Sequence, residues 1–184
     1  MKRITLFITF CLLVQTAVTA QNKSGSASQA ASLVLNNSID ISYMATGDGT
    51  GNDAIMQFST PADYSNGVTS PEQLLRVRSN KNFKVAVRCD ASSFAYQGGD
   101  NNTIESMPDN ALWLKVTANN TGGAVKAPFS TSGYATLSEE NQDLLVNGNY
   151  GGNQTFSVQY KCTPGFNLPA GTYTMNVVFT ATQE

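Results

Sequence analysis

The chain has 184 residues, of which 41% are hydrophobic and only 13% are charged, with a formal net charge of −2 and no histidine. This length suits a single domain, and Ser, Thr, Asn and Gln together supply 64 residues for a polar, weakly charged surface. The lack of histidine excludes Ser-His-Asp and Cys-His nucleophiles, histidine metal ligands and histidine pH switches in this chain. Acidic residues outnumber basic ones by 13 to 11 without a basic cluster, which argues against nucleic acid as a partner.

Residues 1–20 have the pattern of a cleaved secretory signal peptide. Two basic residues precede an apolar run at 4–14, and small residues at 18–20 form a cleavage site before Gln21. The apolar run is shorter than the about 20 residues that a membrane-spanning helix needs. Cys11 lies inside this run without the small residues expected before a lipidated cysteine, so we expect no lipid anchor. The pattern predicts an exported protein, located extracellularly, on the cell surface or in the periplasm, with no membrane insertion after cleavage.

The mature chain is predicted to begin with a flexible arm at 21–32, followed by one β-sandwich domain at 33–184. The arm is composed of small and polar residues that cannot bury enough apolar surface to offset the cost of ordering. Alternating apolar residues then predict a half-buried strand over 33–43. Asn37 interrupts the apolar side, so a kink or bulge that splits this strand is expected.

The next segment, a glycine-rich loop at 46–53, contains the weak calcium candidates Asp48 and Asp53. Their carboxylates are oxygen ligands of the kind that Ca²⁺ accepts, but the loop lacks the EF-hand spacing and its distal glutamate. A solvated turn is the simpler interpretation, and we predict no bound metal and no cofactor. A short apolar run at 54–59 follows the loop.

Two further runs, at 73–78 and 83–89, flank the turn-forming segment 79–82, and this spacing predicts a β-hairpin. A short strand is expected at 93–97, before a polar loop at 98–110.

The alternation over 112–117 directs Leu112, Leu114 and Val116 inward and Trp113 outward, beside Lys115. Trp113 is the only tryptophan of the chain. An exposed aromatic ring on a flat sheet can stack on a sugar, so Trp113 is the candidate ligand-binding residue. The alternative is that it packs beneath one of the long polar loops.

One helix is predicted, over 137–146. Ser138 can cap it, Glu139 and Glu140 fall in its first turn, and Asn147-Gly148 supplies a left-handed stop. Two of Glu139, Glu140 and Asp143 could supply the carboxylate pair that a glycoside hydrolase needs. Acids in a first helical turn are more often capping or solvated groups, and we expect no catalytic residue and no enzymatic activity.

Two last strands are predicted at 155–162 and 172–182, separated by turns at 163–165 and 169–171. Seven or eight short strands without periodic helices between them predict an all-β fold, an antiparallel immunoglobulin-like β-sandwich with one short helix. A closed barrel is the main alternative.

Two cysteines, Cys89 and Cys162, remain in the mature chain. Each continues the apolar face at the end of its strand, so both sulfurs should point into the same core. An even number in an exported chain favours a disulfide, which would stabilise the fold by about 4 kcal/mol in the chain-entropy model. The alternative is two separate buried thiols. No CxxC spacing exists to suggest a catalytic or metal role.

The closing segments 164–173 and 176–182 resemble the last hairpin of bacterial pilin and spore-coat-U-like sandwich subunits. The whole mature chain, including 76–83, is similar to small secreted Bacteroidota proteins without an assigned activity. The pilin resemblance implies a structural subunit, although pilins usually carry their disulfide earlier and their N-terminal extension is an apolar donor strand. Here 21–32 is too polar for that role, and only 33–43 is suited to it.

These observations predict a non-enzymatic, secreted or cell-surface sandwich protein that acts through its surface. A structural, pilin-like subunit that binds itself or other surface proteins is the first hypothesis. A carbohydrate- or protein-binding module is the alternative, with glycans as ligands, and a carboxylate-based glycoside hydrolase is the least favoured.

Overall fold

The computed structural model describes residues 23–44, 53–98 and 106–184. Residues 36–184 form one compact unit, and the residues up to Leu35 belong to another. The signal peptide predicted at 1–20 lies outside the described residues. Residues 23–38 contain neither helix nor strand, and every one of them is exposed.

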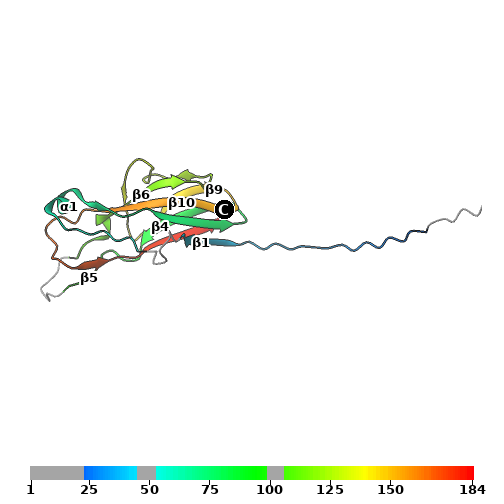
Figure 1. Ribbon diagram of the computed structural model, residues 1–184, viewed down its shortest axis with the longest axis horizontal. Coiled ribbons are helices and arrows are strands. Elements are labelled where there is room, and N and C mark those ends of the chain that lie inside the picture. Colours follow the sequence, from blue (N-terminus) through cyan, green and yellow to red (C-terminus); the bar gives the residue numbers. More distant parts are fainter. Residues whose placement is uncertain (1–22, 45–52, 99–105) are drawn as a thin grey trace, which may run out of the picture. The chain divides into compact units, whose positions relative to one another are not determined.

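The compact unit contains a larger and a smaller antiparallel sheet (Figure 1). The larger sheet has the order β1-β3-β10-β6-β8, with β2 also pairing with β10. Its strands are β1 (Ile39–Tyr43), β2 (Val68–Thr69), β3 (Gln73–Ser79), β6 (Leu112–Asn119), β8 (Ala135–Thr136) and β10 (Gly151–Cys162). The smaller sheet has the order β12-β4-β9-β7. Its strands are β4 (Phe83–Cys89), β7 (Ala124–Val125), β9 (Gln142–Gly148) and β12 (Val177–Gln183).

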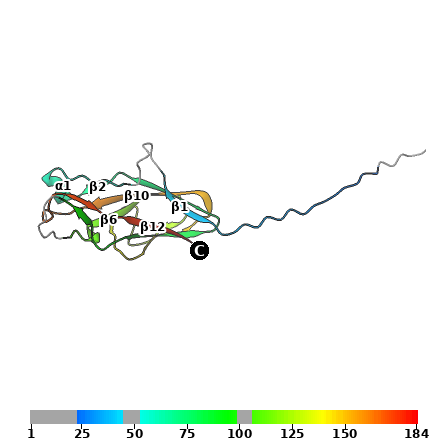
Figure 2. The same ribbon diagram turned by 90° about the horizontal axis from the view of Figure 1, so that it is seen from below.

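The short elements gather at one end of the unit. The two-stranded ladder of β5 (Ala95–Gln97) and β11 (Thr172–Thr174), the helix α1 (Pro61–Asn66) and the 3-10 turn η1 (Asp109–Ala111) complete the fold. In both views α1 lies at the end opposite the C-terminus (Figures 1 and 2). The all-β antiparallel sandwich that the sequence predicted is therefore confirmed.

The core follows from strict alternation along the central strands. On β4 the residues Phe83, Val85, Val87 and Cys89 are all completely buried, while the residues between them are half-buried. On the facing sheet β3 and β6 bury alternate residues in the same way. In β10 the alternation holds from Val158 to Cys162, after a bulge at which Phe156, Ser157 and Val158 are all buried. Each fully buried Val, Leu or Phe contributes about 1.5–3 kcal/mol relative to leaving it exposed, so this buried layer is the main source of stability.

The predicted hairpin at 73–89 is wrong, because β3 and β4 lie in different sheets. The chain crosses from one sheet to the other through residues 80–82. The Asn80 side chain fixes this crossing: its Nδ2 donates to the carbonyl of Asn36 (2.7 Å), and its Oδ1 accepts from the N–H of Ser38 (2.9 Å). A β-hairpin and a connection that crosses between two sheets can have the same turn residues and the same alternation in their strands. The sequence pattern therefore did not distinguish between them. The last long strands, β10 and β12, are likewise in different sheets.

Only the second half of the strand predicted over 33–43 forms, as β1. The ladder between β1 and β3 begins with the pair Ile39 and Ser79, and β3 ends at Ser79, so residues before Ile39 have no partner strand there. Leu33, Val34 and Leu35 are 84%, 82% and 82% exposed. An apolar triplet therefore stays in water, although its alternation matches that of a buried strand.

The helix predicted over 137–146 is also wrong, since β9 begins within it at Gln142. Leu144 and Leu145 are both completely buried, and the register against β4 shifts between Val85 and Ala86. This bulge turns two consecutive leucines into the core, and two adjacent apolar residues beside capping residues imitate a helical pattern.

The helix that does form is α1, at 61–66. Thr60 and Asp63 make a capping box at its start, with Pro61 in the first turn. The predicted run at 54–59 forms neither helix nor strand, and the run at 172–182 divides into β11 and β12 at Met175 and Asn176.

The position of β9 is tested by truncating its two leucines. Leu144→Ala and Leu145→Ala should each lower the free energy of unfolding by about 2–5 kcal/mol, because both side chains are buried. Val34→Ala, at an exposed apolar residue, should change it by less than about 0.5 kcal/mol. Urea denaturation measures all three. If only one of the two leucine variants were destabilised, a helix with a single buried face would be favoured over the bulged strand.

Candidate functional site

Trp113 lies on the outer face of β6, as its alternation predicted. Its side chain is 40% exposed, whereas its neighbours Leu112 and Leu114 are 4% and 0% exposed. Its cross-strand neighbours are Lys161 on β10 and Thr136 on β8. The ring is therefore neither in the core nor fully covered by a loop.

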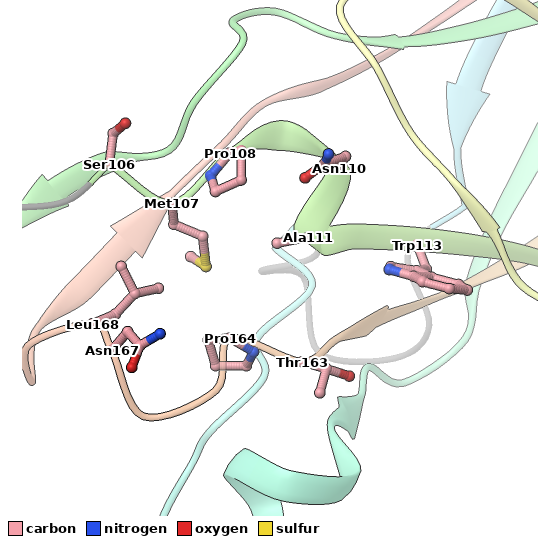
Figure 3. Close-up of a pocket in the computed structure, with 10 residues that line it drawn as sticks. All are labelled: Ser106, Met107, Pro108, Asn110, Ala111, Trp113, Thr163, Pro164, Asn167 and Leu168. Carbon is pink, nitrogen blue, oxygen red and sulfur yellow. The ribbon is translucent and has the colours of Figure 1, made fainter.

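Trp113 borders a cleft of about 390 Å³ between η1 and the loop that follows β10 (Figure 3). This volume is within the about 300–1,000 Å³ range of small-ligand sites. The residues that line the cleft are Ser106, Met107, Pro108, Asn110, Ala111, Trp113, Thr163, Pro164, Asn167 and Leu168.

One wall of the cleft is formed by η1 and the residues before it. The N–H of Ala111 donates to the carbonyl of Pro108 (3.1 Å), and the N–H of Asp109 donates to the carbonyl of Ser92 (3.0 Å). The Asp109 carboxylate in turn accepts from the N–H of Glu139 (2.9 Å). One hydrogen bond within the wall and two to separate segments thus hold it in place.

The other wall is the loop between β10 and β11. Two tyrosines fix its far end: Tyr173 Oη donates to the carbonyl of Pro169 (2.9 Å), and Tyr96 Oη donates to the carbonyl of Ala170 (3.0 Å). Their rings also contact each other at 4.9 Å between centroids.

Phe166 adds an aromatic face to the same loop. It is 65% exposed and stacks on Tyr64 with 5.2 Å between centroids and 22° between planes. Tyr64 in turn contacts Phe58 at 5.4 Å between centroids. The three rings support the loop from the side of α1.

The lining of the cleft combines apolar and neutral polar groups. Of the ten described residues that line it, none is charged, four carry an amide or hydroxyl group, and one is tryptophan. This composition suits a neutral ligand with both hydroxyl groups and an apolar face, because a charged ligand would be desolvated without an ionic partner.

The three carboxylates considered for hydrolysis do not share this cleft. Glu139 and Glu140 are exposed, and Asp143 on β9 forms an ion pair with Lys126 Nζ at 2.6 Å. The hydrogen bond from Lys126 lowers the pKa of Asp143, whereas the general acid of a glycosidase needs a raised pKa. Asp143 therefore fits the role of a surface ion-pair partner.

The calcium candidates divide between the described and undescribed parts of the chain. Asp48 lies outside the described residues, and Asp53 is exposed. Among residues 23–44, 53–98 and 106–184, no three His, Cys, Asp or Glu side chains come together as metal ligands. The described helices include none that is long and apolar enough to cross a bilayer.

The predicted disulfide between Cys89 and Cys162 is wrong in this structure: both are free cysteines. Both are buried, with 0% and 3% exposure, at the ends of β4 and β10 in opposite sheets. Alternation fixes the face on which a side chain lies but not its partner across the core, and a bridge needs Cα atoms within about 6.8 Å. The alternative of two separate buried thiols describes the structure.

Burial also makes both thiols unreactive. Desolvation, reinforced by the charges of Asp109 and Asp90, raises the pKa of Cys89 to about 12. Desolvation raises the pKa of Cys162 to about 11. Near neutral pH almost no thiolate forms at either residue, and the thiolate is the nucleophile.

Alkylation followed by mass spectrometry tests this state of the cysteines. We expect no iodoacetamide adduct on the native mature protein at pH 8, and two adducts when the unreduced protein is first unfolded in guanidinium. One or no adduct in guanidinium, rising to two after reduction, would establish the bridge instead.

No protein-family model matches this chain, and a comparison with characterised proteins finds no match either. The functional argument therefore rests on the geometry. Sequence reasoning identified Trp113 but missed Asn110, Thr163 and Asn167, which reach the cleft from loops where no periodic pattern places a side chain. It also missed Phe166, whose only signal was its position between two turn segments.

Proposed function

We propose that this chain is a non-enzymatic, exported structural subunit of the cell surface or extracellular space that associates with copies of itself. The observation that carries the proposal is the apolar triplet Leu33-Val34-Leu35, which is more than 80% exposed at each residue. Consecutive exposed apolar residues are unusual outside interaction sites.

The edge strand β12 is the surface that suits this triplet best. Its sequence from Val177 to Gln183 contains no charged residue and no proline, and its register against β4 has no bulge. Among the described residues β12 forms a ladder with β4 alone. The strand β1 lies beside it, where Tyr43 packs on Phe179 and the carbonyl of Ser38 accepts from Gln183 Nε2. Long regular edges without charges bind further strands readily.

The other edges are better protected. The strands β7 and β8 have only two residues each. The strand β1 carries an exposed ion pair between Asp40 and Arg78 at 2.8 Å. Short strands and charges are the usual means by which sheets avoid edge-to-edge association, so β12 is the exception.

A second copy is the natural donor of the triplet. Asn36 and Ser38 are held by Asn80, and the carbonyl of Ser38 also accepts from Gln183 Nε2 (2.9 Å). These bonds tie the residues directly after the triplet to their own sandwich. A triplet donated by a neighbouring molecule leaves them in place.

The expected affinity of one such contact is low. Burying the two leucines contributes about 3–6 kcal/mol, and each added backbone hydrogen bond contributes about 0.5–1.5 kcal/mol. The loss of translational and rotational freedom on association costs about 4–15 kcal/mol. We therefore expect association that depends on concentration, as in a polymer or a crowded surface layer.

Sedimentation velocity of the mature protein from about 10 µM to about 1 mM tests this association. The wild type should form dimers and larger species as its concentration rises, whereas Leu33→Asp/Leu35→Asp should remain monomeric. The melting temperature should not change, because the triplet lies outside the sandwich. Ile55→Asp, at a residue 74% exposed on the sandwich itself, is the control and should associate normally.

A second pair of variants tests the edge. Thr180→Lys places a charge on the exposed face of β12 and should weaken association at least tenfold, since edge lysines oppose strand addition. Thr136→Lys makes the same change on the two-residue strand β8 and should have no effect. A wild type that stays monomeric throughout, or equal loss in both lysine variants, would contradict assembly through β12.

Export is tested separately by the mass of the protein recovered from producing cells. We expect a chain that begins at Gln21 without a lipid, located outside the inner membrane. A recovered chain that retains residues 1–20 would contradict the export part of the proposal.

A further inference from the structure

We infer that the cleft beside Trp113 is a binding site for a neutral saccharide, with the indole ring as its stacking platform and Asn110, Thr163 and Asn167 as its hydrogen-bonding groups. This site is independent of the proposed self-association. Its lining residue Thr163 lies against Gly67, which caps α1, and α1 lies at the end of the sandwich opposite the C-terminus (Figures 1 and 2).

Trp113 offers a partly open aromatic face, 40% exposed, at the border of the cleft (Figure 3). An aromatic ring has a negative face, and the axial C–H groups of a pyranose carry a small positive charge. Stacking of the sugar on the indole would remove apolar surface of both partners from water while the sugar hydroxyls stay free to hydrogen-bond.

The polar groups of the site come from both walls. Asn110 belongs to η1, while Thr163 and Asn167 belong to the loop after β10. Amide and hydroxyl groups donate and accept, which matches sugar hydroxyls that do both. Ala111, Pro108 and Pro164 supply the small apolar surface between them.

The charge of the ligand follows from what surrounds the cleft. Among the residues that the structure describes, none of those lining the cleft carries a charge. The nearest acid of η1, Asp109, is occupied by the backbone of Glu139. The side chain of Lys161, the cross-strand neighbour of Trp113, lies against Gly67. The described lining residues offer neutral hydroxyl and amide groups and no opposite charge, which favours a neutral sugar.

The walls are fixed before any ligand binds. The tyrosine hydrogen bonds to Pro169 and Ala170 hold one wall, and the hydrogen bond from Asp109 to Ser92 holds the other. Pre-organised walls reduce the entropy cost of binding.

The single tryptophan makes this site directly measurable, since ligand binding at Trp113 must change the only indole fluorescence of the chain. The probes are cellotetraose, xylotetraose, mannotetraose, maltotetraose, laminaritetraose and tetra-N-acetylchitotetraose, each titrated to about 10 mM. We expect saturable fluorescence changes with at least one of them. Trigalacturonic acid, an anionic sugar, should give none.

Variants assign the response to the cleft. Asn167→Ala should weaken the binding of the responding sugar about tenfold or more, whereas Asn153→Ala, an exposed amide on β10, should leave it unchanged. Trp113→Ala removes the fluorophore, so its binding is measured by calorimetry, and we expect none. Tyr150→Ala, which removes an aromatic ring that is 69% exposed and does not line the cleft, is its control and should bind normally. The Leu33→Asp/Leu35→Asp variant should bind as the wild type does.

Three outcomes would overturn the inference. No fluorescence change with any of the six neutral sugars, a response that Asn167→Ala leaves intact, or equally tight binding of trigalacturonic acid would each do so. A proline-rich peptide that changes the fluorescence when the sugars do not would identify the cleft as a peptide site instead.

Discussion

The layer of alternate side chains between the two sheets is the constraint on which the rest of the molecule depends. Every second residue of β4 is completely buried, and β3, β6 and β10 supply the facing half. This burial fixes the register of each central strand, because a slip by one residue would exchange its two faces. Burial between the sheets does not pair the backbone N–H and C=O groups on the outer edges of the edge strands. Those edges, and the loops at the two ends, are where interactions with other molecules can occur.

The features that depend on the alternation of apolar and polar residues along a strand could be predicted from the sequence. Those that depend on pairing between strands or on loops could not. The sandwich, the outward position of Trp113 and the burial of both cysteines all follow from period two. The pairing of β3 with β4 did not form, because Asn80 supports a crossing between sheets with the same residues that make a hairpin. The bulge at Leu144 and Leu145 was read as a helix, and the bridge between Cys89 and Cys162 depended on a distance across the core that no local pattern encodes. The cleft could not be predicted either, because its polar residues lie outside the strands, where no alternation places their side chains.

The proposed surfaces lie at different parts of the sandwich and require different chemistry. Strand addition at β12 depends on backbone hydrogen bonds and on two leucines from the N-terminal segment, and it is insensitive to the loops. Saccharide binding depends on the loops around Trp113 and is insensitive to the edge. A subunit arranged in this way would assemble through one surface and present the other at the end that carries α1. The two surfaces can therefore be tested, and can fail, independently.

Hydrogen exchange along β12 is the most direct test of strand sharing. The outward backbone amides of Val177–Gln183 should exchange more slowly in the associated wild type than in the monomeric Leu33→Asp/Leu35→Asp variant. The amides within Ser32–Asn37 should gain protection at the same concentrations, because both strands of the new ladder form together. If the protein associates but β12 exchanges equally fast in both forms, the contact lies elsewhere and assembly through this edge is contradicted.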